Sequence, residues 1–113
     1  MVSIIITYYA GLNILKSNLA LLFEQNLSDI EIIIVNDNPS IPLTKDMLCI
    51  SQDNKIQIVT MPQNGGYAAA CNYGVKHSKG ELLIFMDSDI LVSPDWMGQL
   101  LDAYYSVENC GAV

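Results

Sequence analysis

The strongest constraint on the fold is a short, continuous apolar run at residues 82–86 (LLIFM), which two carboxylates follow. Its apolar residues do not alternate with polar ones, and this pattern is typical of a strand covered on both faces. Asp87 and Asp89 stand where that strand would end. If the chain stays extended there, residues two apart point the same way, so both carboxylates face one side. Two like charges so near each other repel, and a cation between them would relieve this repulsion. Ligand sets made only of oxygen atoms suit Mg²⁺ or Mn²⁺.

Further apolar runs and helical patterns surround this strand. The runs predict buried strands at residues 2–6, 31–35 and 56–60, and helices are expected at residues 12–23, 68–78 and from Ser93, the expected N-cap, onwards. A short helix at residues 44–51 and the beginning of another strand at residues 110–113 are also expected. Strands that alternate with helices in this order predict an α/β fold, an open and mostly parallel sheet with helices on both faces.

A polar cluster directly follows each of three predicted strands, at residues 7–11, 36–40 and 87–89. The carboxyl ends of parallel strands lie at one edge of a sheet, and that edge is where an open α/β sheet binds its ligand. Asp-Ser-Asp by itself is also typical of a solvated turn, because Asp and Ser are common turn formers. The convergence of three clusters at one edge favours a binding site over a simple turn.

Composition narrows the class of ligand. With 113 residues, a formal charge of −7 and no basic stripe, the chain is one domain for which we expect no nucleic-acid partner. Because it has five lysines and no arginine, the charge of a phosphorylated ligand would be met by a metal or by helix N-termini. Cys49, Cys71 and Cys110 are widely spaced and predict buried free thiols. The sequence has no signal peptide and no apolar run of about 18 residues, so we expect a cytoplasmic protein.

Four stretches of the sequence together resemble family 2 glycosyltransferases with the GT-A fold. They are the opening strand and turn at residues 2–10, the strand that ends in Asn-Asp-Asn at 31–38, the segment at 64–74, and Asp-Ser-Asp at 87–89, which is similar to the family's DxD motif. Tyr8, Ala10 and Asn36 depart from the family's pattern, and these departures leave the identity of the donor's nucleobase open. The resemblance implies a nucleotide-diphospho-sugar transferase fold, of which residues 1–113 are a truncated, N-terminal, donor-binding portion.

The resemblance also implies roles for individual residues. Thr7 and Tyr9 would contact the nucleobase of the donor, and Asp37 would hydrogen-bond the nucleobase or the ribose. Asp87 would contact the ribose or the metal's ligand shell, and Asp89 would coordinate the Mn²⁺ or Mg²⁺ that bridges the diphosphate. The remaining donor-binding residues that the resemblance implies are Asn64, Gly66 and Asn72.

The implied activity is the transfer of a sugar, with inversion, from a nucleotide-diphospho-sugar donor to a glycan or lipid-linked acceptor in cell-surface polysaccharide or glycan synthesis. Inverting members of the family take the catalytic base and the acceptor site from a later segment. We therefore expect the catalytic base to lie beyond residue 113, and this chain to bind donor and metal but to transfer sugar poorly or not at all.

An apolar sheet edge left uncovered predicts either self-association, as in a homodimer, or marginal stability. The full-length protein is expected in the cytoplasm or at the inner face of the membrane.

Other functions fit less of the sequence. A nucleotidyltransferase of similar fold has a glycine-rich, basic first loop, which residues 7–11 do not provide. A signalling receiver domain needs an acidic pair after its first strand, and a dinucleotide-binding domain needs GxGxxG there. Neither pattern occurs at that position of this sequence. A non-catalytic nucleotide-binding module would retain the fold without a catalytic base, and this alternative stays open.

Overall fold

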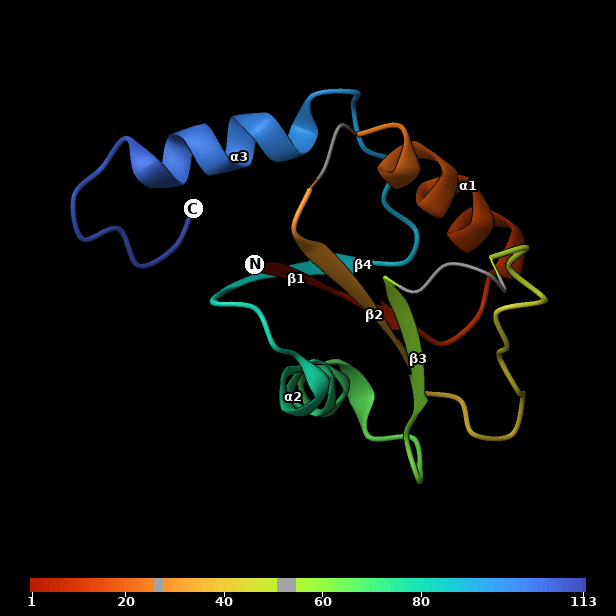
Figure 1. Ribbon diagram of the computed structural model, residues 1–113. Helices are drawn as coiled ribbons and strands as arrows, with labels where there is room; N and C mark the ends of the chain where they lie inside the picture. Colours follow the sequence, from red (N-terminus) through yellow and green to blue (C-terminus); the bar gives the residue numbers. More distant parts are fainter. Residues whose placement is uncertain (26–27, 51–54) are drawn as a thin grey trace.

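The computed structural model describes residues 1–25, 28–50 and 55–113. Within them the strands are β1 (Val2–Tyr8), β2 (Ile30–Asn36), β3 (Ile56–Thr60) and β4 (Leu82–Asp87), and the helices are α1 (Leu12–Phe23), α2 (Gly66–His77) and α3 (Trp96–Tyr105). Neighbouring strands pair in parallel, in the order β3-β2-β1-β4. Helix α1 covers one face of the sheet and α2 covers the other (Figure 1). The predicted α/β fold, with a parallel sheet and helices on both faces, is confirmed.

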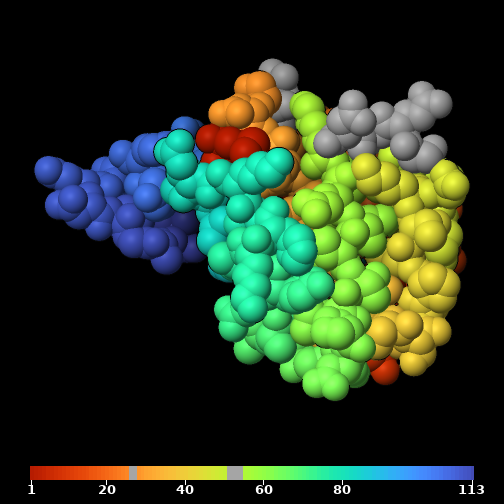
Figure 2. Space-filling view, turned by 60° about the horizontal axis from the view of Figure 1, so that its bottom comes forward, coloured from red at the N-terminus to blue at the C-terminus, as the bar shows by residue number. Residues whose placement is uncertain are grey.

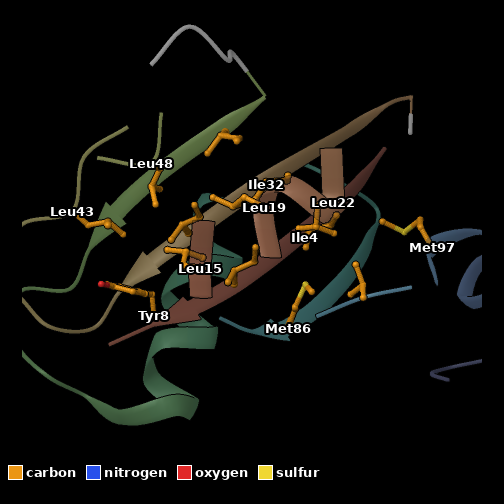
Figure 3. Close-up of a cluster of buried hydrophobic side chains, with 14 residues drawn as sticks. Ile4, Tyr8, Leu15, Leu19, Leu22, Ile32, Leu43, Leu48, Met86 and Met97 are labelled. Atoms are coloured by element: carbon orange, nitrogen blue, oxygen red, sulfur yellow. The ribbon is translucent and has the colours of Figure 1, made fainter. Parts of the chain in front are cut away.

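The two central strands, β1 and β2, form the buried middle of the sheet. Ile4 and Ile5 of β1 are both 0% exposed. Because successive side chains of a strand point to opposite faces, Ile4 belongs to the core under α1 and Ile5 to the core under α2. Figure 3 shows the first of these cores, to which α1 contributes Leu15, Leu19 and Leu22. Complete burial of each such side chain stabilises the fold by about 1.5–3 kcal/mol, so the sheet and α1 are held mainly by this cluster.

Helix α2 packs closely on the opposite face because it presents a glycine to the sheet. Gly74 is buried, and a Cβ atom built on it would lie 2.5 Å from Cγ2 of Ile5 and 3.0 Å from Cγ2 of Val35. Real Cβ atoms do not approach other carbon atoms as closely as the first of these distances, so the contact requires glycine. The small residues of this segment therefore allow the helix backbone to approach the sheet.

Strand β4 lies at the edge of the sheet and, among the described strands, pairs only with β1. Met86 is buried on the α1 side, whereas Leu83 and Phe85 are 38% and 47% exposed. The prediction that this strand is covered on both faces is therefore wrong, because α2 packs mainly on β1 and β2 and leaves one face of β4 open. The exposed apolar side chains lie on this open face of β4, and the expected self-association or marginal stability stays a prediction.

The chain leads away from the sheet after β4. Helix α3 and the residues that follow it project from the rest of the molecule (Figure 2). A groove of about 720 Å³ lies between β4 and α3, and its apolar lining includes Phe85, Trp96 and Leu100. None of the helices in the described part of the chain is long and apolar enough to cross a membrane.

Cys49 lies in a segment that contradicts two predictions. Residues 45–49 form turns instead of the predicted short helix, and Cys49 has a φ of 60°, a left-handed conformation that a right-handed helix cannot contain. Ser51, the last residue of that predicted helix, lies outside the described residues. The prediction of buried thiols is also wrong, because Cys49 is exposed and Cys71 and Cys110 are half-buried, although all three cysteines are free.

The C-terminal segment also differs from its prediction. Helix α3 begins at Trp96 with Asp95 as its N-cap, so Ser93 is not the cap. The carbonyl of Ser93 accepts a hydrogen bond from the Trp96 N–H at 3.2 Å, and the serine therefore belongs to a turn that precedes the helix. Residues 110–113 form no strand, because none of the described strands pairs with them.

A hydrogen-bonded cluster joins the amino ends of β1, β2 and β4. Oε1 of Glu31 accepts hydrogen bonds from the Ser3 hydroxyl and from the Lys79 N–H, both at 2.5 Å. Oγ of Ser3 accepts the N–H of Gly80 at 2.8 Å. Burial raises the pKa of Glu31, but these hydrogen bonds and the nearby charge of Lys79 outweigh it, so the pKa lies below its usual value. The cluster holds the beginning of β4 against the two central strands.

We expect Gly74→Ala to lower the free energy of unfolding by about 1–3 kcal/mol, because the added methyl group overpacks the helix–sheet contact. Urea denaturation followed by circular dichroism measures the change. Gly111→Ala is the matched control, since nothing lies within 4 Å of a Cβ atom at that position. Equal stability of the two variants would contradict the close contact between α2 and the sheet.

Glu31→Gln should lower the free energy of unfolding at neutral pH by about 1 kcal/mol, a value that allows for solvent screening of a half-buried carboxylate. The folded protein holds the pKa of Glu31 below the unfolded value of 4.5. The stabilisation is therefore present above the unfolded pKa and is lost as the pH falls through the folded pKa. Urea denaturation of both proteins from neutral to acid pH measures the difference, with the exposed Glu108→Gln as control. A difference that stays constant toward acid pH would rule out this role of the carboxylate.

Candidate functional site

A cavity of about 310 Å³ opens at the carboxyl ends of the strands. Five residues that the sequence predicted for the donor and the metal border it, namely Thr7, Tyr9, Asp37, Asp87 and Asp89. The rest of the wall consists of Tyr8, Ala10, Tyr67, Ala70 and Ser88. The three polar clusters therefore converge at one edge of the sheet, as parallel strands require.

The register of the sheet brings the polar residues of the wall together. Thr7 of β1 lies opposite Val35 of β2 on one side and opposite Asp87 of β4 on the other. These strands run further than the sequence predicted, so that β1 ends at Tyr8, β2 at Asn36 and β4 at Asp87. Thr7 and Asp87 are therefore held by sheet pairing rather than by a loop.

The Asp-Ser-Asp motif leaves the sheet in a turn. The N–H of Ile90 donates a hydrogen bond to the carbonyl of Asp87 at 3.4 Å, which begins the turn. Ser88 is buried, whereas Asp87 and Asp89 are exposed and both border the cavity. The chain is therefore not extended at residues 88–89, and Ser88 borders the same cavity as the two carboxylates, so the predicted alternation does not describe this turn.

Two buried amides of the α1 segment hold the chain that follows β4. Nδ2 of Asn18 lies 3.5 Å from the carbonyl of Asp87, to which it donates. Nε2 of Gln25 donates to the carbonyl of Ser93 at 2.8 Å, and its Oε1 accepts the Met97 N–H at 3.5 Å. Neither residue was predicted from the sequence, although Asn18 is an amide inside the leucine stripe of α1.

Asp37 carries a structural role that the sequence did not predict. Its side chain is buried, and its two oxygens accept the N–H groups of Gly65 at 2.8 Å and Gly66 at 3.0 Å. Gly66 has a φ of 85°, a conformation that glycine adopts without strain. Asp37 at the end of β2 therefore anchors the loop that leads into α2.

Asn36, which departs from the family's pattern, shapes the loop after β2. Its Oδ1 accepts the N–H of Asn38 at 3.0 Å, and its Nδ2 donates to the carbonyl of Ile41 at 2.9 Å. The side chain is fully buried and does not border the cavity. In this chain the amide is therefore part of the scaffold behind Asp37.

The structure leaves three of the implied donor-binding residues outside the cavity wall. Asn64 lies in the loop before α2, where its Oδ1 accepts the N–H of Gly66 at 3.2 Å. Gly66 reaches the site only through its hydrogen bond to Asp37. Asn72 lies on an exposed part of α2. Their assignment to the donor stays a prediction, and the wall contains Tyr67 and Ala70 from the same segment instead.

The carboxylates at the cavity suit a hard divalent cation that takes only some of its ligands from the protein. No group of three or more His, Cys, Asp or Glu side chains able to hold a metal occurs in the described part of the chain. Asp87 and Asp89 provide two carboxylates beside one cavity. Mg²⁺ is commonly bound by one or two carboxylates together with water and substrate phosphates, and two aspartates meet that requirement.

Known proteins match both the sequence and the fold. A family model described as glycosyl transferase family 2 matches residues 3–111. The chain belongs to glycosyl transferase family 2. The resemblance inferred from four short stretches is thereby confirmed over nearly the whole chain.

Curated relatives of this family 2 chain are longer than the chain itself. RC0461, an uncharacterized glycosyltransferase of Rickettsia conorii, is 31% identical over 109 residues, which make up 96% of this chain and 18% of that protein. The succinoglycan biosynthesis protein ExoW of Rhizobium meliloti is 30% identical over 114 residues, or 97% of this chain and 35% of that protein. The chain therefore spans between 18% and 35% of the length of these two relatives.

The fold is also that of solved glycosyltransferases. The mannosyltransferase PcManGT from Pyrobaculum calidifontis, solved in complex with GDP-Man and Mn²⁺, superposes with a TM-score of 0.77 and 20% sequence identity. The match covers 88% of this chain and 31% of that one. The family 2 chain thus has the GT-A fold that its sequence predicted.

We expect Asp37→Ala to lower the free energy of unfolding by about 1–3 kcal/mol, because the Gly65 N–H loses its acceptor and the Gly66 N–H keeps only Asn64 Oδ1. Amide hydrogen exchange should accelerate at Gly65 and Gly66 and much less at Gly74, within α2. Asp46→Ala, in an exposed turn, is the control variant. Unchanged exchange at Gly65 and Gly66 in the Asp37 variant would show that the carboxylate does not anchor the loop.

Proposed function

We propose that this chain is the donor-binding part of a metal-dependent glycosyltransferase. The donor would be a nucleotide-diphospho-sugar, and the acceptor of the whole enzyme a glycan or a lipid-linked sugar. The observation that carries the proposal is the cavity at the carboxyl edge of the sheet, where Thr7, Tyr9, Asp37, Asp87 and Asp89 meet. An open α/β sheet binds its ligand at that edge.

The electrostatics of the cavity support the participation of a metal. Three aspartates border it, and no lysine does among the described residues, in a chain that has no arginine. A diphosphate would be repelled by these carboxylates unless a cation stood between them. Mn²⁺ or Mg²⁺, held by Asp89 and Asp87, would supply that charge and stabilise the departing nucleoside diphosphate as a Lewis acid.

The remaining polar groups suit the nucleoside. Each oxygen of Asp37 accepts one loop N–H, and an ionised carboxylate has about four acceptor sites. Asp37 thus retains acceptor capacity for a hydroxyl of the ribose or an N–H of the base. Thr7 and Tyr9 border the cavity next to it and are assigned to the base.

Two comparisons support the class of donor and product. PcManGT, which shares the fold, was solved with GDP-Man and Mn²⁺. ExoW, which shares 30% of its residues with this chain over the match, is a succinoglycan biosynthesis protein. We therefore propose inverting transfer in polysaccharide synthesis, with the catalytic base and the acceptor site supplied by a segment outside residues 1–113. The donor half of the reaction is the part assigned to this chain.

Calorimetric titration with UDP, dTDP and GDP, each with and without Mn²⁺, tests the proposal. We expect one nucleotide to bind only in the presence of the metal. Asp89→Ala should abolish that binding, because it removes the carboxylate that is assigned to coordinate the cation at the diphosphate.

Asp102→Ala is the matched control for this titration. Asp102 is exposed on α3 and does not border the cavity, so its variant should bind like the unaltered chain. If the chain has a native circular dichroism spectrum and binds none of the nucleotides with metal, the proposed function is wrong.

A further inference from the structure

Tyr67 is an exposed large side chain of the cavity wall whose role was not predicted from the sequence. It is the second residue of α2, and its side chain is 58% exposed although it borders a concave site. Tyr9, which follows β1, is 54% exposed and borders the same cavity. Ligand sites are commonly lined by aromatic rings with a few polar groups. Two half-exposed rings beside three carboxylates therefore offer apolar surface that a planar ligand group can cover.

The backbone that carries Tyr67 is held in place before any ligand arrives. The two residues that precede it, Gly65 and Gly66, donate their N–H groups to the buried carboxylate of Asp37. Ala70, one turn later, is buried and borders the same cavity. The helix end is thus fixed on both sides of Tyr67. A side chain on a fixed backbone loses less freedom on binding, so more of its contact energy appears as affinity.

The hydroxyl group of Tyr67 lies near Cys71 and Asp87. A hydrogen bond with Cys71, partial desolvation and the charges of Cys71 and Asp87 raise the pKa of Tyr67 above its usual value of 10. An aromatic ring is suited to stacking, whereas a diphosphate requires the cation that the aspartates would hold.

We infer that Tyr67 stacks on the nucleobase of the donor and forms, with Tyr9, the aromatic part of the nucleoside pocket. The inference rests on the proposed function, because it takes the ligand to be a nucleoside diphosphate. It divides the cavity into two parts, with the rings at the base and the carboxylates of Asp87 and Asp89 at the metal-bound diphosphate. Every base has a π-face, so the stacking adds affinity without choosing among bases.

The test compares a ligand that has a base with one that has none. The intact chain, Tyr67→Ala and Tyr67→Phe are titrated in Mn²⁺ with UDP, dTDP and GDP, and separately with pyrophosphate. We expect Tyr67→Ala to weaken nucleotide binding about tenfold and to leave pyrophosphate binding unchanged. Tyr67→Phe keeps the ring and should bind nucleotide within about twofold of the intact chain. Tyr105→Ala, an exposed tyrosine of α3 outside the cavity, is the control.

Each other outcome overturns a defined part of the inference. Equal nucleotide affinity of Tyr67→Ala and the intact chain shows that the ring makes no contact with the base. An equal loss in Tyr67→Phe and Tyr67→Ala assigns the contact to the hydroxyl and overturns stacking. A parallel loss of pyrophosphate binding places Tyr67 at the diphosphate instead. If the intact chain itself binds no nucleotide, the proposed function fails and the inference fails with it, which distinguishes that result from the other three.

Discussion

The parallel pairing of β1 with both of its neighbours is the constraint on which the rest of the structure depends. It places Thr7 between Val35 and Asp87, so segments far apart in the sequence end at one edge of the sheet. The same pairing turns Ile4 toward α1 and Ile5 toward α2. A shift of one residue would exchange these faces and move Asp87 away from Thr7. The hydrophobic core and the geometry of the cavity are therefore specified together.

The elements that could be predicted from the sequence are those whose signal is local. The apolar run at residues 56–60 predicts β3 with its observed bounds, and the leucine stripe predicts α1, because residue spacing records which face is buried. Spacing does not record which strand lies at the edge. Residues 82–86 look like the runs of β1 and β2, yet Phe85 is half-exposed, because its burial depends on what else packs on the sheet. Turn geometry, as at Cys49, was missed for a similar reason, since its left-handed φ has no glycine to signal it.

In the candidate site, too, some features could be predicted from the sequence and others could not. Asp37, Asp87 and Asp89 could be predicted because they stand at or just beyond the carboxyl ends of strands. The contact of Asp37 with Gly65 could not, because it joins residues 28 positions apart and depends on how closely α2 packs. The place of Tyr67 on the cavity wall depends on that same packing. The positions of the acids can therefore be predicted from the sequence, whereas the contacts that position them become visible only in the folded chain.

The register of the sheet has a consequence for a chain made from its N-terminus onward. The cavity needs Thr7 from β1, Asp37 at the end of β2 and Asp87 from β4, which comes last among the described strands. No N-terminal piece that ends before residue 87 contains all three residues. During synthesis the candidate site is therefore incomplete until residues 87–89 have left the ribosome and β4 has joined β1. A nascent chain has no assembled cavity at this edge before that pairing forms.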